Sequence, residues 1–340
     1  MTRAAAGRGR RSVLAALSLL LALTLVAGLP RLVGTGWAQA LTVLRRLEPS
    51  TVLALTVLWA TGLWIYTWVS TGTLPGLRHH QALTLNLTGS LVSNVLPFGG
   101  AAGVATTYAV ATGWGFAPGP ISLMVLATGM ANLAIRLVLP AVSIAALLAT
   151  GLPLPPRGLA AALIALAVLA AVAVAGAGLL VSPRAARRFG QLADTIAGAL
   201  ATVLRRRPPG PLQNRAVAVQ AHARTVLYRG WPSLTFGMIG YYTTEAVLLY
   251  ITVSELNQPL PWPRVLAAFT LSRLLTSAVI TPSGLGISET GTTALLVAFG
   301  LPPAVAVAAV LVLNFYTYLI ELPAGLIAWS AVLIQHRRRS

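Results

Sequence analysis

The sequence lacks cysteine and lysine and is poor in acidic residues and histidine. Among 340 residues there are no Cys, six Asp and Glu together, and four His. A disulfide framework, thiolate catalysis and cysteine-based metal sites are therefore excluded, and few histidines remain for a metal centre. Charged residues make up 9% of the chain, against about 25% in an ordinary soluble domain. These shortages exclude a soluble globular protein, and we expect no metal site and no cofactor.

The basic residues, all of them Arg, give the chain a net charge of +18. Such an excess is also found in nucleic-acid-binding proteins, but these carry their charge on a polar surface without repeated apolar runs of about 20 residues. Here 56% of the residues are hydrophobic. We therefore expect a membrane protein with no nucleic-acid partner.

Six apolar runs are long enough to cross a hydrocarbon core of about 30 Å at about 1.5 Å per residue. They cover residues 13–29, 51–70, 121–150, 158–181, 231–253 and 304–334. The first run has features of a signal peptide, but the Ala38-Gln-Ala40 segment that resembles a cleavage site lies far beyond it. We interpret it as a retained anchor and predict six full transmembrane helices.

Two further apolar regions are each interrupted by Pro and Gly. Residues 82–96 and 101–112 flank Pro97-Phe98-Gly99-Gly100, and residues 265–281 and 287–299 flank Pro282-Ser283-Gly284-Leu285-Gly286. Most of these arms are too short to span the core, and irregular backbone is tolerated at that depth only inside protein or beside water. We predict two re-entrant helical hairpins in an all-α fold. The alternative is four tilted, Pro-kinked complete spans.

The arginines are consistent with this topology. With both termini in the cytoplasm, most of them fall on the cytoplasmic side, as the positive-inside rule requires. Many lie in residues 184–229, which we predict to be an amphipathic helical connector on the membrane surface. A plain solvated connector is the alternative.

The hairpins belong to a pattern that occurs twice. Pro97 and Pro282 are separated by 185 residues, as are Gly115 and Gly300. An odd number of predicted crossings separates the hairpins, so they enter the membrane from opposite sides. We interpret residues 1–340 as a single membrane domain with inverted halves 51–150 and 231–334, an architecture that favours a binding site near the midplane. The alternative is coincidence among the abundant Pro and Gly.

Ionisable residues within these segments are costly unless they are paired or face a cavity. Together with the glycine-rich tips, they define the predicted substrate-binding residues: Asn94, Pro97, Gly99, Gly100, Gly103, Asn132, Arg136, Glu245, Arg273, Pro282, Gly284, Gly286, Glu289 and Glu321. We expect Arg273 to pair with Glu289 or Glu321. Glu289 either caps the helix that begins at Ile287 or pairs with Arg273 and releases it to a lipid phosphate. The alternative for some of these residues is a purely structural role in helix packing.

No catalytic constellation stands out in the sequence. We find no serine with a base, no paired carboxylates near a membrane boundary and no P-loop. His79 and His80 are adjacent at the cytoplasmic mouth of the first hairpin, and we interpret them as an interfacial pair, with a catalytic pair as the alternative. We therefore predict no catalytic residues, and an ATP-driven pump is disfavoured.

Two stretches resemble the membrane part of the lysylphosphatidylglycerol synthase and flippase family. The segment from Ser93 to Gly100 is similar to that family's Asn, Leu-Pro and Gly-rich segment, and the segment from Thr281 to Glu289 is similar to its Pro, Gly-x-Gly and Glu segment. The resemblance implies a multi-pass protein of the bacterial cytoplasmic membrane that handles anionic or polyprenyl-phosphate-linked lipids. The first segment continues as Ala101-Ala102-Gly103, without the Glu and Arg often found there.

The leading hypothesis is a flippase-like transporter of an anionic phospholipid or a polyprenyl-phosphate-linked glycolipid. The sequence has no soluble aminoacyltransferase domain, so we do not expect synthase activity. One alternative is an enzyme, or the membrane subunit of one, for lipid-linked glycosyl or aminoacyl transfer. Another is a non-catalytic scaffold for envelope-lipid synthesis. The expected partners are membrane lipids and, in the alternatives, an envelope-lipid synthase or glycosyltransferase.

Overall fold

The computed structural model describes residues 28–95 except residue 33, 99–151, scattered positions between 163 and 191, 212–256, 260–275 and 286–337. Most of the predicted spans 13–29 and 158–181 lies outside these residues, as do Pro97, Pro282 and Gly284.

Everything described is helix, turn or loop, without any strand, which confirms the all-α prediction. The helices are α2 (Trp37–Leu44), α3 (Pro49–Thr73), α4 (His79–Val95), α5 (Gly99–Gly113), α6 (Pro118–Ala149), α9 (Leu212–Glu255), α10 (Trp262–Leu275), α11 (Ile287–Ala298), α12 (Pro303–Asn314), the π-helix η2 (Phe315–Leu319) and α13 (Glu321–Arg337).

Three stretches of helix in the described part are long and apolar enough to cross a membrane. They are Pro49–Thr73, Pro118–Ala149 and Pro303–Ile334, and they match the predicted spans 51–70, 121–150 and 304–334. Each begins with a proline in its first turn, where the ring fixes a helical φ and no N–H is missed. The third stretch is interrupted by η2, which the sequence did not predict.

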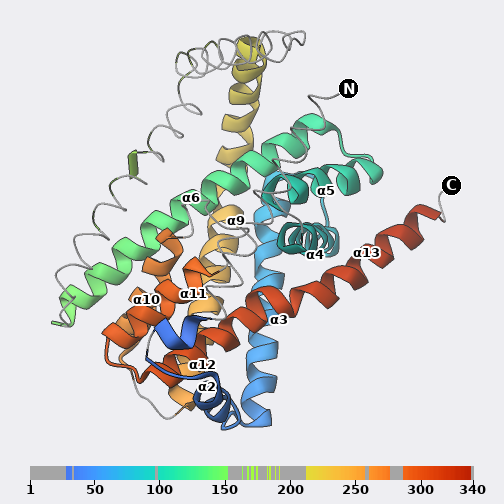
Figure 1. Cartoon of the computed structure of the whole chain (residues 1–340). Coiled ribbons are helices and arrows are strands. Elements are labelled where there is room, and N and C mark those ends of the chain that lie inside the picture. Colours follow the sequence, from blue (N-terminus) through green and yellow to red (C-terminus); the bar gives the residue numbers. More distant parts are fainter. Residues whose placement is uncertain are drawn as a thin grey trace, which may run out of the picture.

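The predicted span 231–253 lies within α9, a helix of 44 residues that begins at Leu212. The end of the predicted connector is therefore continuous with that span. Helix α9 lies alongside α3 over much of its length (Figure 1). Glycines line this contact: a Cβ atom on Gly230 would lie 2.1 Å from the carbonyl oxygen of Gly72, and one on Gly62 would lie 2.3 Å from the hydroxyl of Thr244. Small residues let the two backbones approach each other, as is usual between membrane helices.

The two interrupted regions form two pairs of packed helices, α4 with α5 and α10 with α11. These helices have 17, 15, 14 and 12 residues. At about 1.5 Å per residue, each is shorter than a hydrocarbon core of about 30 Å. In the first pair, a Cβ atom on Gly103 would lie 2.1 Å from Ser93 Oγ. The α4 and α5 backbones therefore pack closely, and the predicted arms correspond to observed helices.

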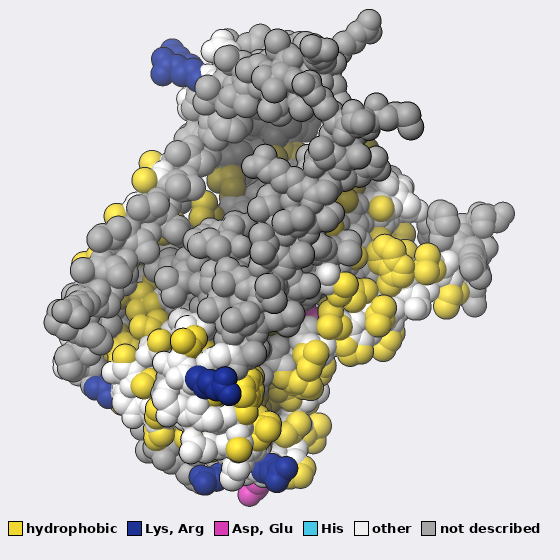
Figure 2. Space-filling view, viewed as in Figure 1, with side chains coloured by type: hydrophobic (Ala, Val, Ile, Leu, Met, Phe, Trp, Pro, Cys, Tyr) yellow, Lys and Arg dark blue, Asp and Glu magenta, His cyan; other side chains and the backbone are white. Residues whose placement is uncertain are grey.

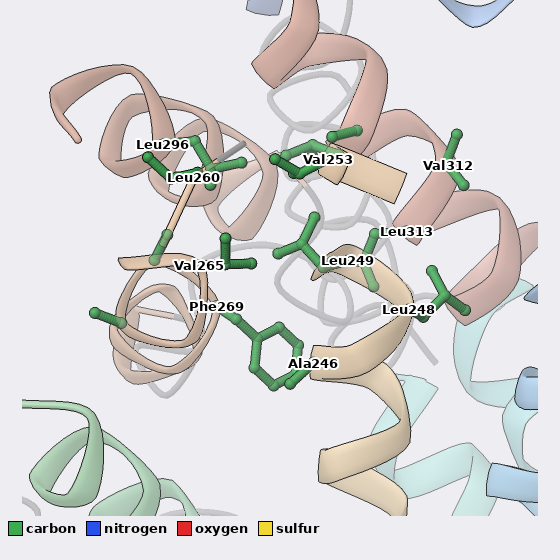
Figure 3. Packing of buried hydrophobic residues seen from close by; sticks show 14 of the residues in the cluster. Ala246, Leu248, Leu249, Val253, Leu260, Val265, Phe269, Leu296, Val312 and Leu313 are labelled. Carbon is green, nitrogen blue, oxygen red and sulfur yellow. The ribbon is translucent and has the colours of Figure 1, made fainter. Parts of the chain in front are cut away.

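The main hydrophobic core joins α9, α10, α11 and α12. Figure 3 shows the ring of Phe269 on α10 pointing toward Ala246 on α9, with Leu249 of α9 near Leu313 of α12. Outside this core, large apolar side chains remain exposed, among them Leu53 on α3 and Ile327 on α13. Figure 2 shows hydrophobic side chains over much of the described surface, with basic ones near the end at which α2 lies and also at the opposite end. This distribution suits a molecule surrounded by lipid.

Candidate functional site

The central feature of the site is a buried ion pair between α9 and α10. Arg273 Nη2 donates to Glu245 Oε2 at 3.1 Å, and the two side chains are 14% and 10% exposed. The guanidinium carbon also lies 4.9 Å from the centre of the Phe269 ring. The expectation that Glu289 or Glu321 is the partner was wrong, because the packing of α10 against α9 brings Arg273 to Glu245 and the other two carboxylates are engaged elsewhere.

Glu289 caps the N-terminus of α11. Its Oε2 atom accepts hydrogen bonds from the Gly286 N–H at 2.5 Å and from the Ser288 hydroxyl at 2.9 Å. Gly286 has φ of +86°, a conformation that glycine adopts without steric cost. The carboxylate satisfies an N–H that the helix leaves unpaired, and it lies at the positive end of the helix dipole. Of the two readings of Glu289, the structure therefore confirms capping.

Glu321 joins the last span to the first helix pair. It is the first residue of α13, is 4% exposed, and accepts a short hydrogen bond from the Ser90 hydroxyl on α4. One turn further along α13, a Cβ atom on Gly325 would lie 2.7 Å from the Leu87 carbonyl oxygen. The two helices are therefore in close contact at Glu321.

Asn132 on α6 accepts a hydrogen bond from the Tyr242 hydroxyl at 2.6 Å. Tyr242 lies on α9, one turn before Glu245, so this bond connects the polar stripe on α6 to the helix that carries the ion pair. Arg136 lies one turn beyond Asn132 and is half-buried.

Two cavities flank these residues. The first has a volume of about 570 Å³ and is mainly apolar, with Leu44, Leu311 and Phe315 among its walls, and Asn94 and Glu289 also line it. The second, of about 440 Å³, is more polar and is lined by Asn132, Gly100, Gly103, Ser90 and Ser93.

The predicted site residues thus lie in several different places. Asn94 and Glu289 line the first cavity, and Gly100, Gly103 and Asn132 line the second. Glu245, Arg273 and Glu321 form polar contacts without lining either of these cavities. Gly99 packs against the backbone of Ser93, and Gly286 serves the α11 cap. The convergence of all fourteen residues on a single site stays a prediction, since Pro97, Pro282 and Gly284 lie outside the described residues.

Sequence reasoning missed several neutral residues of this network. Ser90 and Tyr242 hydrogen-bond to predicted site residues, and Tyr318 lines the first cavity together with Glu289. A signal was present, because Tyr242 and Glu245 are three residues apart within an apolar span and therefore face the same side of α9. Polar residues at helical spacing inside a span are as informative as charged ones.

Long apolar helices and a surface rich in exposed apolar side chains define a multi-pass helical membrane protein. The family model described as lysylphosphatidylglycerol synthase TM region matches residues 13–325. The chain belongs to this family, as the two glycine-containing segments indicated. No curated protein matches the sequence.

Proposed function

We propose that the protein moves an anionic phospholipid or a polyprenyl-phosphate-linked lipid between the leaflets of a bacterial cytoplasmic membrane. The observation that carries this proposal is the buried Arg273–Glu245 pair close to an apolar cavity of about 570 Å³. Tyr318 connects the two, because it lines the cavity and lies within electrostatic reach of Arg273.

In this proposal the cavity receives hydrocarbon chain and Arg273 receives phosphate. A guanidinium donates two parallel hydrogen bonds to phosphate oxygens and keeps its charge in a poor solvent. Glu245 holds Arg273 in place in the absence of lipid, and the phosphate then competes with the Glu245 carboxylate. This exchange replaces one anionic partner by another, so the guanidinium never remains buried and unpaired.

The proposal includes the topology of six full crossings, two re-entrant hairpins and two inverted halves, 51–150 and 231–334, with both termini in the cytoplasm. The short α4, α5, α10 and α11 helices support it. Because the chain has no Cys, single cysteines can be introduced and labelled from each side of the membrane. Labelling of position 78 from outside, or free labelling of positions 97 and 282 as exposed loops, would contradict this topology.

Reconstitution tests the function directly. The purified protein is placed in phosphatidylcholine vesicles that contain a fluorescent phosphatidylglycerol, a fluorescent phosphatidylethanolamine or a polyprenyl phosphate, and movement between leaflets is measured. We expect movement of a lipid with a net negative charge and its loss in Arg273→Gln/Glu245→Gln, which keeps hydrogen-bonding groups and leaves no unpaired charge. If this variant folds and moves lipid at the wild-type rate, phosphate binding by Arg273 is wrong. A covalently altered lipid in the vesicles would instead indicate an enzyme.

A further inference from the structure

Glu321 differs from the other two carboxylates of the site in the groups that surround it. Glu245 has Arg273 as its ion-pair partner, and Glu289 accepts a hydrogen bond from the backbone N–H of Gly286. The polar partner of Glu321 is the Ser90 hydroxyl, which is neutral. In the described part of the chain, no basic side chain lies within ion-pair distance of Glu321.

In the described part of the chain, none of the side chains that face Glu321 carries a positive charge. The groups that face it are the Ser90 hydroxyl from α4, the Tyr66 hydroxyl from α3, and Tyr241 and Glu245 from α9. Arg273 is bound to Glu245. The π-helix that precedes Glu321 contributes Tyr316, whose hydroxyl is bound to α3, and Tyr318, which lines the first cavity.

A carboxylate that is 4% exposed and has only neutral hydrogen-bonding partners is costly in its ionised form. Protonation removes this cost. Buried carboxyl groups of this kind form the proton-binding sites of membrane pumps and transporters.

Glu321 also follows a distorted part of the last span. The preceding residues, Phe315–Leu319, form a π-helix, a distortion that is frequent at functional sites. On one side of this junction, Tyr316 donates a hydrogen bond to the Val52 carbonyl oxygen of α3 at 3.0 Å. On the other side, α13 packs closely on α4 through Gly325. The Ser90–Glu321 contact therefore lies at the junction of two segments: η2, which is hydrogen-bonded to α3, and α13, which is packed on α4. A change in this contact would alter how α13 packs on α4.

We propose that Glu321 is a proton-binding site that couples lipid movement to the proton gradient across the membrane. In this scheme a proton enters from one aqueous side, neutralises the Glu321 carboxylate and allows α13 to shift against α4, and it leaves to the other side in the second conformation. The coupling rests on the proposed function, whereas the proton site itself does not.

The proton site is tested by infrared spectroscopy of the full-length protein in detergent, across a pH titration. We expect the carbonyl stretch of a protonated carboxyl group that titrates in the wild type, is absent in Glu321→Gln and is retained in Glu48→Gln, an exposed control at the start of α3. In Ser90→Ala the band is expected to remain at a changed frequency, because its hydrogen bond is lost. A band that is equally strong in wild type and Glu321→Gln, or no titrating band at all, would overturn the proposal.

The coupling is tested in phosphatidylcholine vesicles containing fluorescent phosphatidylglycerol, with and without a pH difference across the membrane. We expect the gradient to speed lipid movement several-fold in wild type and Glu48→Gln and to have no effect in Glu321→Gln. Lipid movement that ignores the gradient in the wild type overturns the coupling. If the wild type moves no lipid under any condition, the proposed function fails, and the infrared titration still decides the proton site.

Discussion

The α4–α5 pair and the α10–α11 pair share a plan but differ in charge. Each consists of two short packed helices, and the 185-residue separation of Pro97 and Pro282 aligns Thr88 with Arg273 and Val104 with Glu289. The first pair contains no Arg, Asp or Glu. The second therefore supplies an ion-pair partner and a charged cap that the first cannot supply.

The two aligned residues of the first pair, Thr88 and Val104, make no contact that requires a charged partner on another helix. The Thr88 hydroxyl donates to the Thr84 carbonyl oxygen within its own helix, and Val104 lines the polar cavity. Arg273, in contrast, reaches across to another helix. The two helix pairs thus have a similar backbone plan, whereas the arginine and the carboxylate lie only in the second pair. Substitutions at aligned positions can test this difference.

The largest effect is expected at the aligned positions Arg273 and Thr88. Arg273→Ala leaves Glu245 buried without its ion-pair partner and should cost about 3–5 kcal/mol of stability. Thr88→Val removes one hydrogen bond within a helix and should cost about 1 kcal/mol. Thermal unfolding of the purified variants in detergent measures both. Similar losses of stability in the two variants would show that the ion pair is not what distinguishes the second helix pair.

A smaller effect is expected from the close packing of the first pair. Gly103→Ala places a Cβ atom 2.1 Å from Ser93 Oγ and 3.0 Å from the Gly89 carbonyl oxygen, so the Ser93 side chain must rotate and the α4 backbone must shift slightly. Overpacking of this kind costs about 1–3 kcal/mol. Gly100→Ala is the matched control, because no atom lies within 4 Å of the added carbon. Melting temperatures of the two variants should differ by several degrees, and equal values would refute the packing argument.

The smallest effect is expected at the aligned positions Glu289 and Val104. Glu289→Ala removes the acceptor of the Gly286 N–H and should cost about 1 kcal/mol, the usual value of a cap. Glu289→Gln keeps an acceptor and should lose less. Val104→Ala alters a side chain that is 39% exposed and should change stability by less than about 0.5 kcal/mol. Denaturation in mixed micelles resolves these differences, and a larger loss in Val104→Ala than in Glu289→Ala would reverse the comparison.

Features encoded by neighbouring residues were predictable from the sequence. The spans at 51–70 and 121–150 follow from local hydropathy, and Pro49 and Pro118 mark their first turns. The capping role of Glu289 follows from its place three residues after Gly286. The identity of Arg273's partner depends instead on how α10 lies against α9, which no local pattern records. The π-helix is a distortion of the backbone, and the apolar run that contains it reads as a continuous span.

The glycine contact between α3 and α9 restricts how a lipid can reach the interior. Gly72 and Gly230 bring the two backbones together, and a Cβ atom on Gly237 would lie 2.8 Å from the Val69 nitrogen. Such a contact leaves no space for a hydrocarbon chain between the helices. The α3–α9 side of the protein is therefore closed to hydrocarbon chains along this contact. In the proposed function, a lipid would have to enter the two cavities from a different side. Spin labels placed on α3 and α9 should accordingly report a constant separation while labels on the shorter helices move.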